Sequence, residues 1–263
     1  MSNNQNVLLR VHVHPEDPLV LVVTIDRPPV NALSLDLLRQ LRDLFSGLSA
    51  TQPASRCVVI TGSGKTFSAG ADVKELSERS TETQMARSVI SRGCFDAIRR
   101  CGVPVIAAVN GAAVGAGFVV ASCCDIVIAS ESASFSLPEV LVGVMGGTRH
   151  LARLVPDKMV RYLALSGRRV SAQTLASFGA VQEITTPDGL MPAALALASD
   201  IAKNSPAAVA LMKEAINLTE DMPLNEGYRV EQLFTTLASS MPDSKEAALA
   251  FLEKRKPVWS ANR

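Results

Sequence analysis

The sequence predicts an α/β protein whose strands are largely parallel and whose C-terminal third is helical. Apolar runs typical of buried strands occur at 56–62, 103–109 and 125–130. They alternate with helical patterns, an order typical of layered α/β folds. After about residue 145, most segments have helical patterns that begin with Ser, Asp or Pro, residues common at helix starts. We therefore predict a core over residues 1–200 and a helical region over residues 201–263.

Each element follows from its local pattern. Residues 7–26 contain two β-rich runs separated by Pro-Glu-Asp-Pro, which predicts a hairpin. Apolar residues recur with helical spacing over 35–48 and again over 81–100. The pair Asn110-Gly111 predicts a turn, and a short apolar helix begins near Gly115. The helices of the C-terminal third are expected at 155–167, 171–179, 190–204, 206–218 and 244–255.

Charge and cysteine content argue against several kinds of partner. The net charge is +1 at pH 7, so no strong field recruits nucleic acid or an anionic membrane. No charged residue occurs from Cys101 to Cys124, but Pro104 and the glycines divide this stretch into strand, turn and helix rather than a membrane span. The five cysteines and three histidines lack metal-ligand spacing, which favours reduced thiols over a metal site. Because the N-terminus lacks a secretory signal, we expect a cytoplasmic protein.

Two loops have the same kind of sequence, in which small residues follow a strand and precede a helix. The strand at 56–62 leads to Phe-Ser-Ala-Gly-Ala-Asp, and the strand at 103–109 leads to Asn-Gly-Ala-Ala-Val-Gly-Ala-Gly. Small side chains let a ligand approach the backbone, and free N–H groups at a helix start attract negative charge. Close packing of a helix on a strand also demands glycine and alanine, so the residues alone leave both interpretations open.

Several separated motifs resemble one family. The segments ITGSGKTFSAGADVKEL, VIAAVNGAAVGAGFVVASCCDIVIAS and FSLPEVLVGV are together similar to the enoyl-CoA hydratase/isomerase (crotonase) superfamily. The similarity extends from DRPPVNALS at 26–34 to AFLEKRKPVW at 250–259. It implies stacked ββα units with a helical C-terminal trimerisation region, and hence a homotrimer or homohexamer. It also implies an acyl-CoA substrate, with coenzyme A bound as part of that substrate and no separate cofactor or metal.

The resemblance also implies which residues bind the thioester. The backbone N–H groups of Ala71 and Ala116 match the family's oxyanion hole. The anion is then a transient enolate oxygen, which preorganised backbone donors stabilise without a charged side chain. The positions implied to bind coenzyme A are Asn31, Ala32, Leu33, Ser68, Ala69, Lys74, Phe251 and Lys254. Lys74 and Lys254 also suit ordinary solvated surface, an alternative that the residues leave open.

By the same resemblance, Glu139 in FSLPEV is the catalytic carboxylate. Hydratases of the family use two glutamates, and the position of the other, three residues beyond Ala116, is Val119. The chain is also about three residues short between Gly143 and Gly146. A single carboxylate in an apolar pocket has a raised pKa and can remove a proton at one carbon and return it at another.

One shuttling carboxylate suffices to move a double bond from the 3,4 to the 2,3 position, so isomerisation is slightly favoured. Hydration is easier with two acids, because water must be deprotonated while Cα gains a proton. Among the other acids, Asp72 is expected to cap a helix, and Glu75 and Glu78 to be exposed. The alternatives are a single-glutamate hydratase or lyase acting on a branched, cyclic or aromatic acyl-CoA, and a non-catalytic protein that binds CoA esters or serves as a scaffold.

Overall fold

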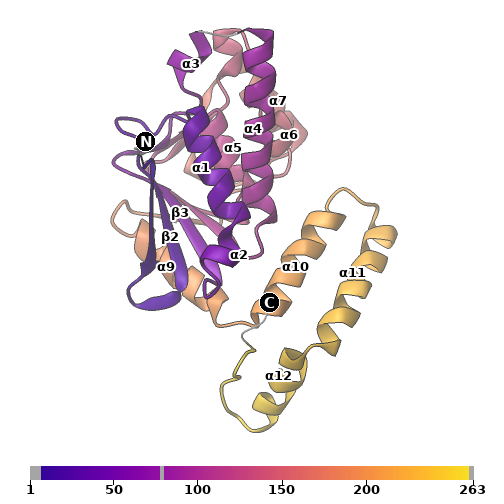
Figure 1. Ribbon diagram of the computed structural model, residues 1–263. Helices are drawn as coiled ribbons and strands as arrows, with labels where there is room; N and C mark the ends of the chain where they lie inside the picture. Colours follow the sequence, from indigo (N-terminus) through magenta and orange to yellow (C-terminus); the bar gives the residue numbers. More distant parts are fainter. Residues whose placement is uncertain (1–6, 78–79, 261–263) are drawn as a thin grey trace.

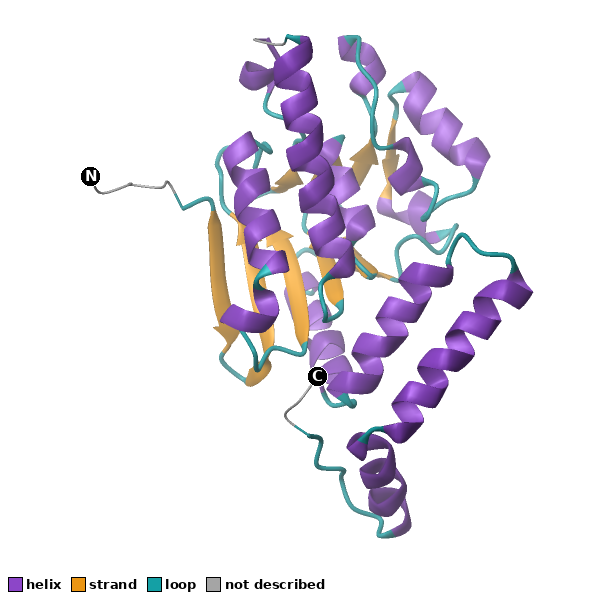
Figure 2. Ribbon diagram, turned by 45° about the vertical axis from the view of Figure 1, so that its right-hand side comes forward, coloured by secondary structure: helices purple, strands orange, loops and turns teal. Residues whose placement is uncertain are grey.

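The computed structural model describes residues 7–77 and 80–260 and contains two β-sheets among helices (Figures 1 and 2). The larger sheet has six strands: β1 (Leu9–His14), β2 (Asp17–Ile25), β3 (Cys57–Gly62), β5 (Val105–Val109), β7 (Ile126–Ser130) and β10 (Glu183–Thr185), in that order. The smaller sheet has four: β4 (Thr66–Ser68), β6 (Ala112–Val114), β8 (Ser134–Ser136) and β9 (Arg169–Ser171), again in that order. The predicted α/β class is confirmed.

Strand directions in the larger sheet agree with the sequence analysis. β1 and β2 are antiparallel and form the predicted hairpin, whereas the strands from β2 to β10 in this sheet run parallel to one another. Every residue of β3 and β5 is buried. Burial on both faces explains why these strands are continuous apolar runs rather than alternating ones.

Helices cover both faces of the larger sheet. α1 (Leu35–Ser46), followed by the short α2 (Leu48–Thr51), packs on one face beside α4 (Thr81–Arg100) and α5 (Ala116–Cys123) (Figure 1). α9 (Leu190–Ala202) packs on the other face. Val58 and Ile60 face the first layer, and Cys57 and Val59 face α9. This division follows from the two-residue period of a strand.

A ββα unit occurs three times in succession. The chain runs along a strand of the larger sheet, forms a short strand of the smaller sheet and then enters a helix. The units are β3–β4–α3, where α3 is Val73–Ser77, then β5–β6–α5, and then β7–β8–η1, where η1 is a 3-10 helix over Glu139–Val142. Because β4, β6 and β8 are parallel neighbours, the segments that follow them emerge at one edge of the smaller sheet. The prediction of stacked ββα units is confirmed.

Several segments of the C-terminal third belong to the core, which its helical pattern does not predict. α7 (Asp157–Ser166), α8 (Ala172–Ala176), α9, α10 (Pro206–Thr219) and α12 (Pro242–Leu252) confirm the predicted helices. However, α9 belongs to the core layer, β9 and β10 extend the two sheets, and α6 (Thr148–Leu151) packs against α5. α11 (Leu224–Ser240) is an additional helix that the sequence analysis omits. Its start lacks a Ser or Asp cap, because Pro223 precedes it.

Helices α10, α11 and α12 form an arm that extends from the body (Figure 1). An apolar groove of about 430 Å³ runs between them, with Leu211, Met212 and Phe234 among its lining residues. Lys213 of α10 ties the arm to the core, since its Nζ lies 2.7 Å from Asp125 Oδ2. α9 ends at Ala202, near the predicted division at residue 200, and the division itself stays a prediction.

The apolar stretch from Cys101 to Cys124 contains β5, β6 and α5. Within residues 7–77 and 80–260, no helix is both long and apolar enough to cross a membrane. All five cysteines are buried and none forms a disulfide. Burial raises the pKa of the Cys57 and Cys123 thiols to about 12, so both thiols are protonated at neutral pH.

Candidate functional site

The two small-residue loops meet at the edge of the smaller sheet. Gly70 lies between β4 and α3 with φ +84°, a conformation that favours glycine. A Cβ at Gly70 would lie 2.5 Å from the carbonyl oxygen of Val114 and 3.4 Å from the backbone nitrogen of Ala116. The backbones of the two loops therefore touch at a point where no side chain fits between them.

Two backbone N–H groups at this junction have no acceptor within residues 7–77 and 80–260. Among the described residues, neither the Ala71 N–H nor the Ala116 N–H donates a hydrogen bond. Ala71 forms an isolated bridge with Leu33 that uses the flanking peptide groups instead. Ala116 is the first residue of α5, where the helix provides no partner for the N–H. Both predicted oxyanion-hole residues are partly exposed.

Glu139 lies against the start of α5. Its Oε1 lies 2.5 Å from where a Cβ on Gly115 would be, so the carboxylate occupies space that only a glycine leaves open. Its Oε2 is buried and has no hydrogen-bond partner among the described residues. Burial raises the pKa of this carboxyl above its ordinary value. Glu139 thus combines a raised pKa with an acceptor that no described residue uses, and it lies against Gly115, the residue before Ala116.

The wall next to this carboxylate is apolar. Val119, one turn further along α5, is only 2% exposed. A Cβ on Gly147 would lie 2.7 Å from Val119 Cγ2 and 3.0 Å from Leu137 Cδ1. The loop before α6 therefore packs directly onto Val119, at the position where the resemblance places a second carboxylate in hydratases.

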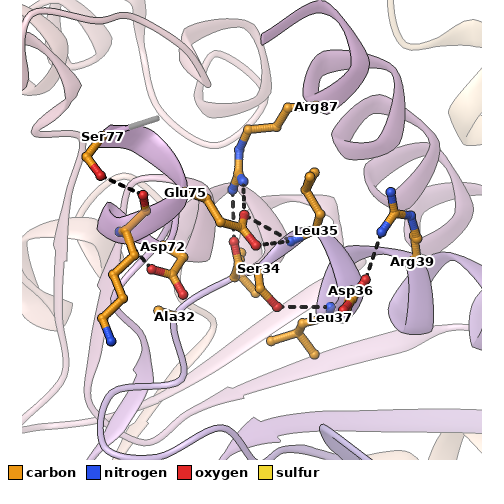
Figure 3. A network of polar contacts seen from close by, with 12 residues as sticks. Ala32, Ser34, Leu35, Asp36, Leu37, Arg39, Asp72, Glu75, Ser77 and Arg87 are labelled. Carbon is orange, nitrogen blue, oxygen red and sulfur yellow. Dashed lines mark hydrogen bonds and ion pairs between the residues drawn. The ribbon is translucent and has the colours of Figure 1, made fainter. Parts of the chain in front are cut away.

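The other acids near the loops have structural partners. Asp72 accepts a hydrogen bond from the Lys74 N–H and pairs with Arg27. Although burial opposes it, these contacts lower the pKa of Asp72, and its predicted capping role is consistent with the Lys74 bond. Glu75 is not exposed as predicted, because it binds the Leu35 N–H and Arg87 (Figure 3). Glu78 lies outside the described residues.

Five of the positions predicted to bind coenzyme A lie around the first loop. Asn31 is fully buried, and its Nδ2 donates to the carbonyl oxygens of Ser63 and Thr66 at 2.9 and 2.7 Å. Ser68, also fully buried, donates from Oγ to the Asn31 carbonyl oxygen at 2.7 Å. These two side chains hold the loop together in this structure. Leu33 is likewise buried, whereas Ala32 and Ala69 are partly exposed.

The remaining coenzyme A positions are on the surface. Lys74 is exposed on α3, beside the first loop. Phe251, 84% exposed, and Lys254 lie at and just after the end of α12 on the arm, and Figure 1 shows α12 far from α3 and α5. Within the described residues, no group of three or more His, Cys, Asp or Glu side chains is arranged to hold a metal ion.

Comparison with known proteins places these features in context. The sequence model described as "Enoyl-CoA hydratase/isomerase" matches residues 16–262. The (7aS)-7a-methyl-1,5-dioxo-2,3,5,6,7,7a-hexahydro-1H-indene-carboxyl-CoA hydrolase of Mycobacterium tuberculosis is 39% identical over 90% of this chain and 96% of the relative. The 2,3-dehydroadipyl-CoA hydratase of Escherichia coli is 36% identical over 90% of this chain and 94% of the relative. A crystal structure of enoyl-CoA hydratase from Bacillus anthracis superimposes with a TM-score of 0.91 at 32% identity, covering 97% of this chain and 100% of the other.

Proposed function

The chain belongs to the enoyl-CoA hydratase/isomerase family, and we propose that it acts on an acyl-CoA thioester through an enolate. The N–H groups of Ala71 and Ala116 hold the enolate oxygen, and Glu139 moves the proton. The observation that carries this proposal is the buried Oε2 of Glu139, which has no partner among the described residues, on a carboxylate that lies against Gly115, the residue before Ala116. A buried polar atom without a partner is costly, and such perturbed acids cluster at functional sites.

The chemistry follows from these groups. The Glu139 carboxylate takes a proton from Cα, and the electron pair of the broken C–H bond moves onto the thioester oxygen. Two backbone donors aimed at this oxygen stabilise the charge that develops there, and loss of one such donor typically costs about 2.7–4 kcal/mol. The resulting carboxylic acid then returns the proton to carbon. The raised pKa of Glu139 brings its proton affinity closer to that needed near neutral pH.

Within this chemistry we favour isomerisation of a 3-enoyl-CoA to a 2-enoyl-CoA. Glu139 would remove a proton at C2 to give a dienolate and return it at C4, so one carboxylate serves both transfers. Val119 and Leu137 provide an apolar wall where the family's hydratases have a second carboxylate. Such a wall offers no group to deprotonate water.

A second candidate is the addition of water to, or hydrolysis of, a branched, cyclic or aromatic acyl-CoA. The relatives named above support it, because one is named a hydrolase of a bicyclic CoA ester and another a hydratase. Such an enzyme would need a group other than residue 119 to orient water. A panel of 2-enoyl-CoA and 3-enoyl-CoA esters, followed at the thioester absorbance band, separates the two candidates.

We also propose that coenzyme A lies along the first loop, from Ala32 to Lys74, and that the chain forms a homotrimer or homohexamer. The exposed Phe251 and Lys254 would then reach coenzyme A in a neighbouring subunit. The separation of α12 from α3 within one chain, visible in Figure 1, supports such sharing. Sedimentation of the purified protein as a monomer at micromolar concentration would contradict this arrangement.

Exchange of the Cα protons of butyryl-CoA in D2O tests the enolate directly, whichever reaction follows. We expect the wild type to exchange them, as observed by NMR. Glu139→Gln keeps the size of the side chain but cannot accept the proton, so the rate should fall by roughly 10²–10⁴-fold while butyryl-CoA still binds. Unchanged exchange in a folded Glu139→Gln variant would refute the assignment. A wild type that binds butyryl-CoA and the panel esters without exchange or turnover would support the non-catalytic alternative.

A further inference from the structure

The direction of the Ala71 N–H is set by the backbone of Leu33. The Leu33 N–H donates to the Gly70 carbonyl oxygen at 2.7 Å, and the Asp72 N–H donates to the Leu33 carbonyl oxygen at 3.3 Å. The Gly70 carbonyl and the Ala71 N–H belong to the same trans peptide group, so they point in opposite directions. Holding this carbonyl toward Leu33 therefore aims the Ala71 N–H away from Leu33.

Leu33 is itself held by an ion pair whose arginine is nearly buried and whose glutamate is partly exposed. Arg87, from the middle of α4, donates from Nη2 to the Leu33 carbonyl oxygen at 2.8 Å. Its Nη1 lies 2.6 Å from Glu75 Oε2 on α3. The Glu75 carboxylate in turn accepts the Leu35 N–H at 3.1 Å, at the first residue of α1 (Figure 3). Arg87 and Glu75 thus join α4 and α3 to residues 33–35, the segment that fixes the direction of the Ala71 N–H.

A role in stability alone does not explain the Arg87–Glu75 pair, because burial of Arg87 costs desolvation free energy. Arg87 is only 9% exposed, and burying a guanidinium carries a large desolvation cost that a partner only partly offsets. The planar fork of arginine reaches Glu75 and Leu33 at once, which a lysine ammonium does less well. Arg27 forms a second contact to the same loop, through Asp72 and the Ala32 carbonyl. Loss of Arg87 should therefore loosen the loop without abolishing the fold.

We propose that Arg87 and Glu75 are positioning residues for the Ala71 donor. They hold Leu33 and Leu35, Leu33 holds the Gly70–Ala71 peptide, and this peptide polarises the substrate carbonyl. The proposal rests on the proposed function, since it takes Ala71 as an oxyanion-hole donor. Neither side chain touches the substrate, so their loss should slow the chemical step far more than it weakens binding.

The test uses crotonyl-CoA labelled with carbon-13 at the thioester carbonyl. Hydrogen bonds to this carbonyl lower its stretching frequency, which isotope-edited infrared spectroscopy measures in the bound ester. Arg87→Met removes both hydrogen bonds but keeps much of the apolar stem. Glu75→Gln, on a partly exposed side chain, removes the ion pair with less risk to folding, and Arg87→Lys retains the charge. Arg39→Met is the matched control, because it breaks the exposed Arg39–Asp36 pair on α1.

We expect Arg87→Met and Glu75→Gln to reduce the frequency shift. They should also lower the Cα exchange rate of saturating butyryl-CoA by about 10- to 100-fold, the range for a donor displaced by up to 1 Å. The dissociation constant of crotonyl-CoA should change less than threefold, Arg87→Lys should be intermediate, and Arg39→Met should match the wild type. Folded Arg87→Met and Glu75→Gln variants with the full shift and rate would overturn the proposal. A wild type that binds crotonyl-CoA without any shift would instead overturn the oxyanion hole itself.

Discussion

Replacement of Gly115 by alanine should displace the Glu139 carboxylate and so impair its function, although residue 139 itself is unchanged. Gly115 has φ +53° and ψ −122°, a conformation outside the regions that other residues occupy, so the variant should lose about 1–3 kcal/mol of unfolding free energy. Its Cβ would lie 2.5 Å from Glu139 Oε1, whereas ordinary contacts begin near 3.4 Å. The carboxylate must therefore retreat by about 0.9 Å, a displacement of the size that costs on the order of 10²-fold in rate when it misplaces a reacting group.

The assay is Cα exchange of butyryl-CoA, combined with urea unfolding. Gly179→Ala is the control, since Gly179 also has a positive φ of +74° but has open space where the Cβ would be. Both variants should lose stability, and only Gly115→Ala should lose exchange by about 10²-fold. Equal exchange rates in Gly115→Ala and the wild type would refute the inference that the carboxylate must stand beside the start of α5.

Two further predictions concern the same site. Burial raises the pKa of Glu139 and the base must be ionised, so on acidification wild-type exchange should decline at a pH above the pKa of an ordinary glutamate. A carboxyl whose pKa is raised in the folded state stabilises the protein at low pH, so the wild type should lose stability relative to Glu139→Gln as the pH rises through the folded-state pKa. Curves of exchange rate and of unfolding free energy against pH check the two expectations. Val119→Glu should gain hydration of crotonyl-CoA relative to the wild type and lose stability, since it buries a new acid; wild-type hydration much faster than 3-enoyl-CoA isomerisation would show that another residue already activates water.

Local patterns in the chain are enough for much of this fold. The apolar runs of β3, β5 and β7 and the helical spacing of apolar residues in α1 and α4 can be read from the residues of each segment alone. The small residues before Ala71 and Ala116 show where a backbone can be approached, whereas Glu139 is singled out only by the resemblance. The resemblance then assigns roles to these positions, but the residues themselves do not say which groups meet.

Contacts between distant segments depend on packing, and they decide the rest. α9, like α10 and α12, is predicted only as a helix, and the tertiary structure decides that it covers one face of the larger sheet. The sequence predicts that Glu75 is exposed, and it becomes the partner of Arg87 only because α4 packs close to α3. The space that Gly115 leaves for Glu139 likewise arises when β6 and β8 pair and bring the two segments together. Such contacts depend on how whole elements dock, and no local periodicity carries that information.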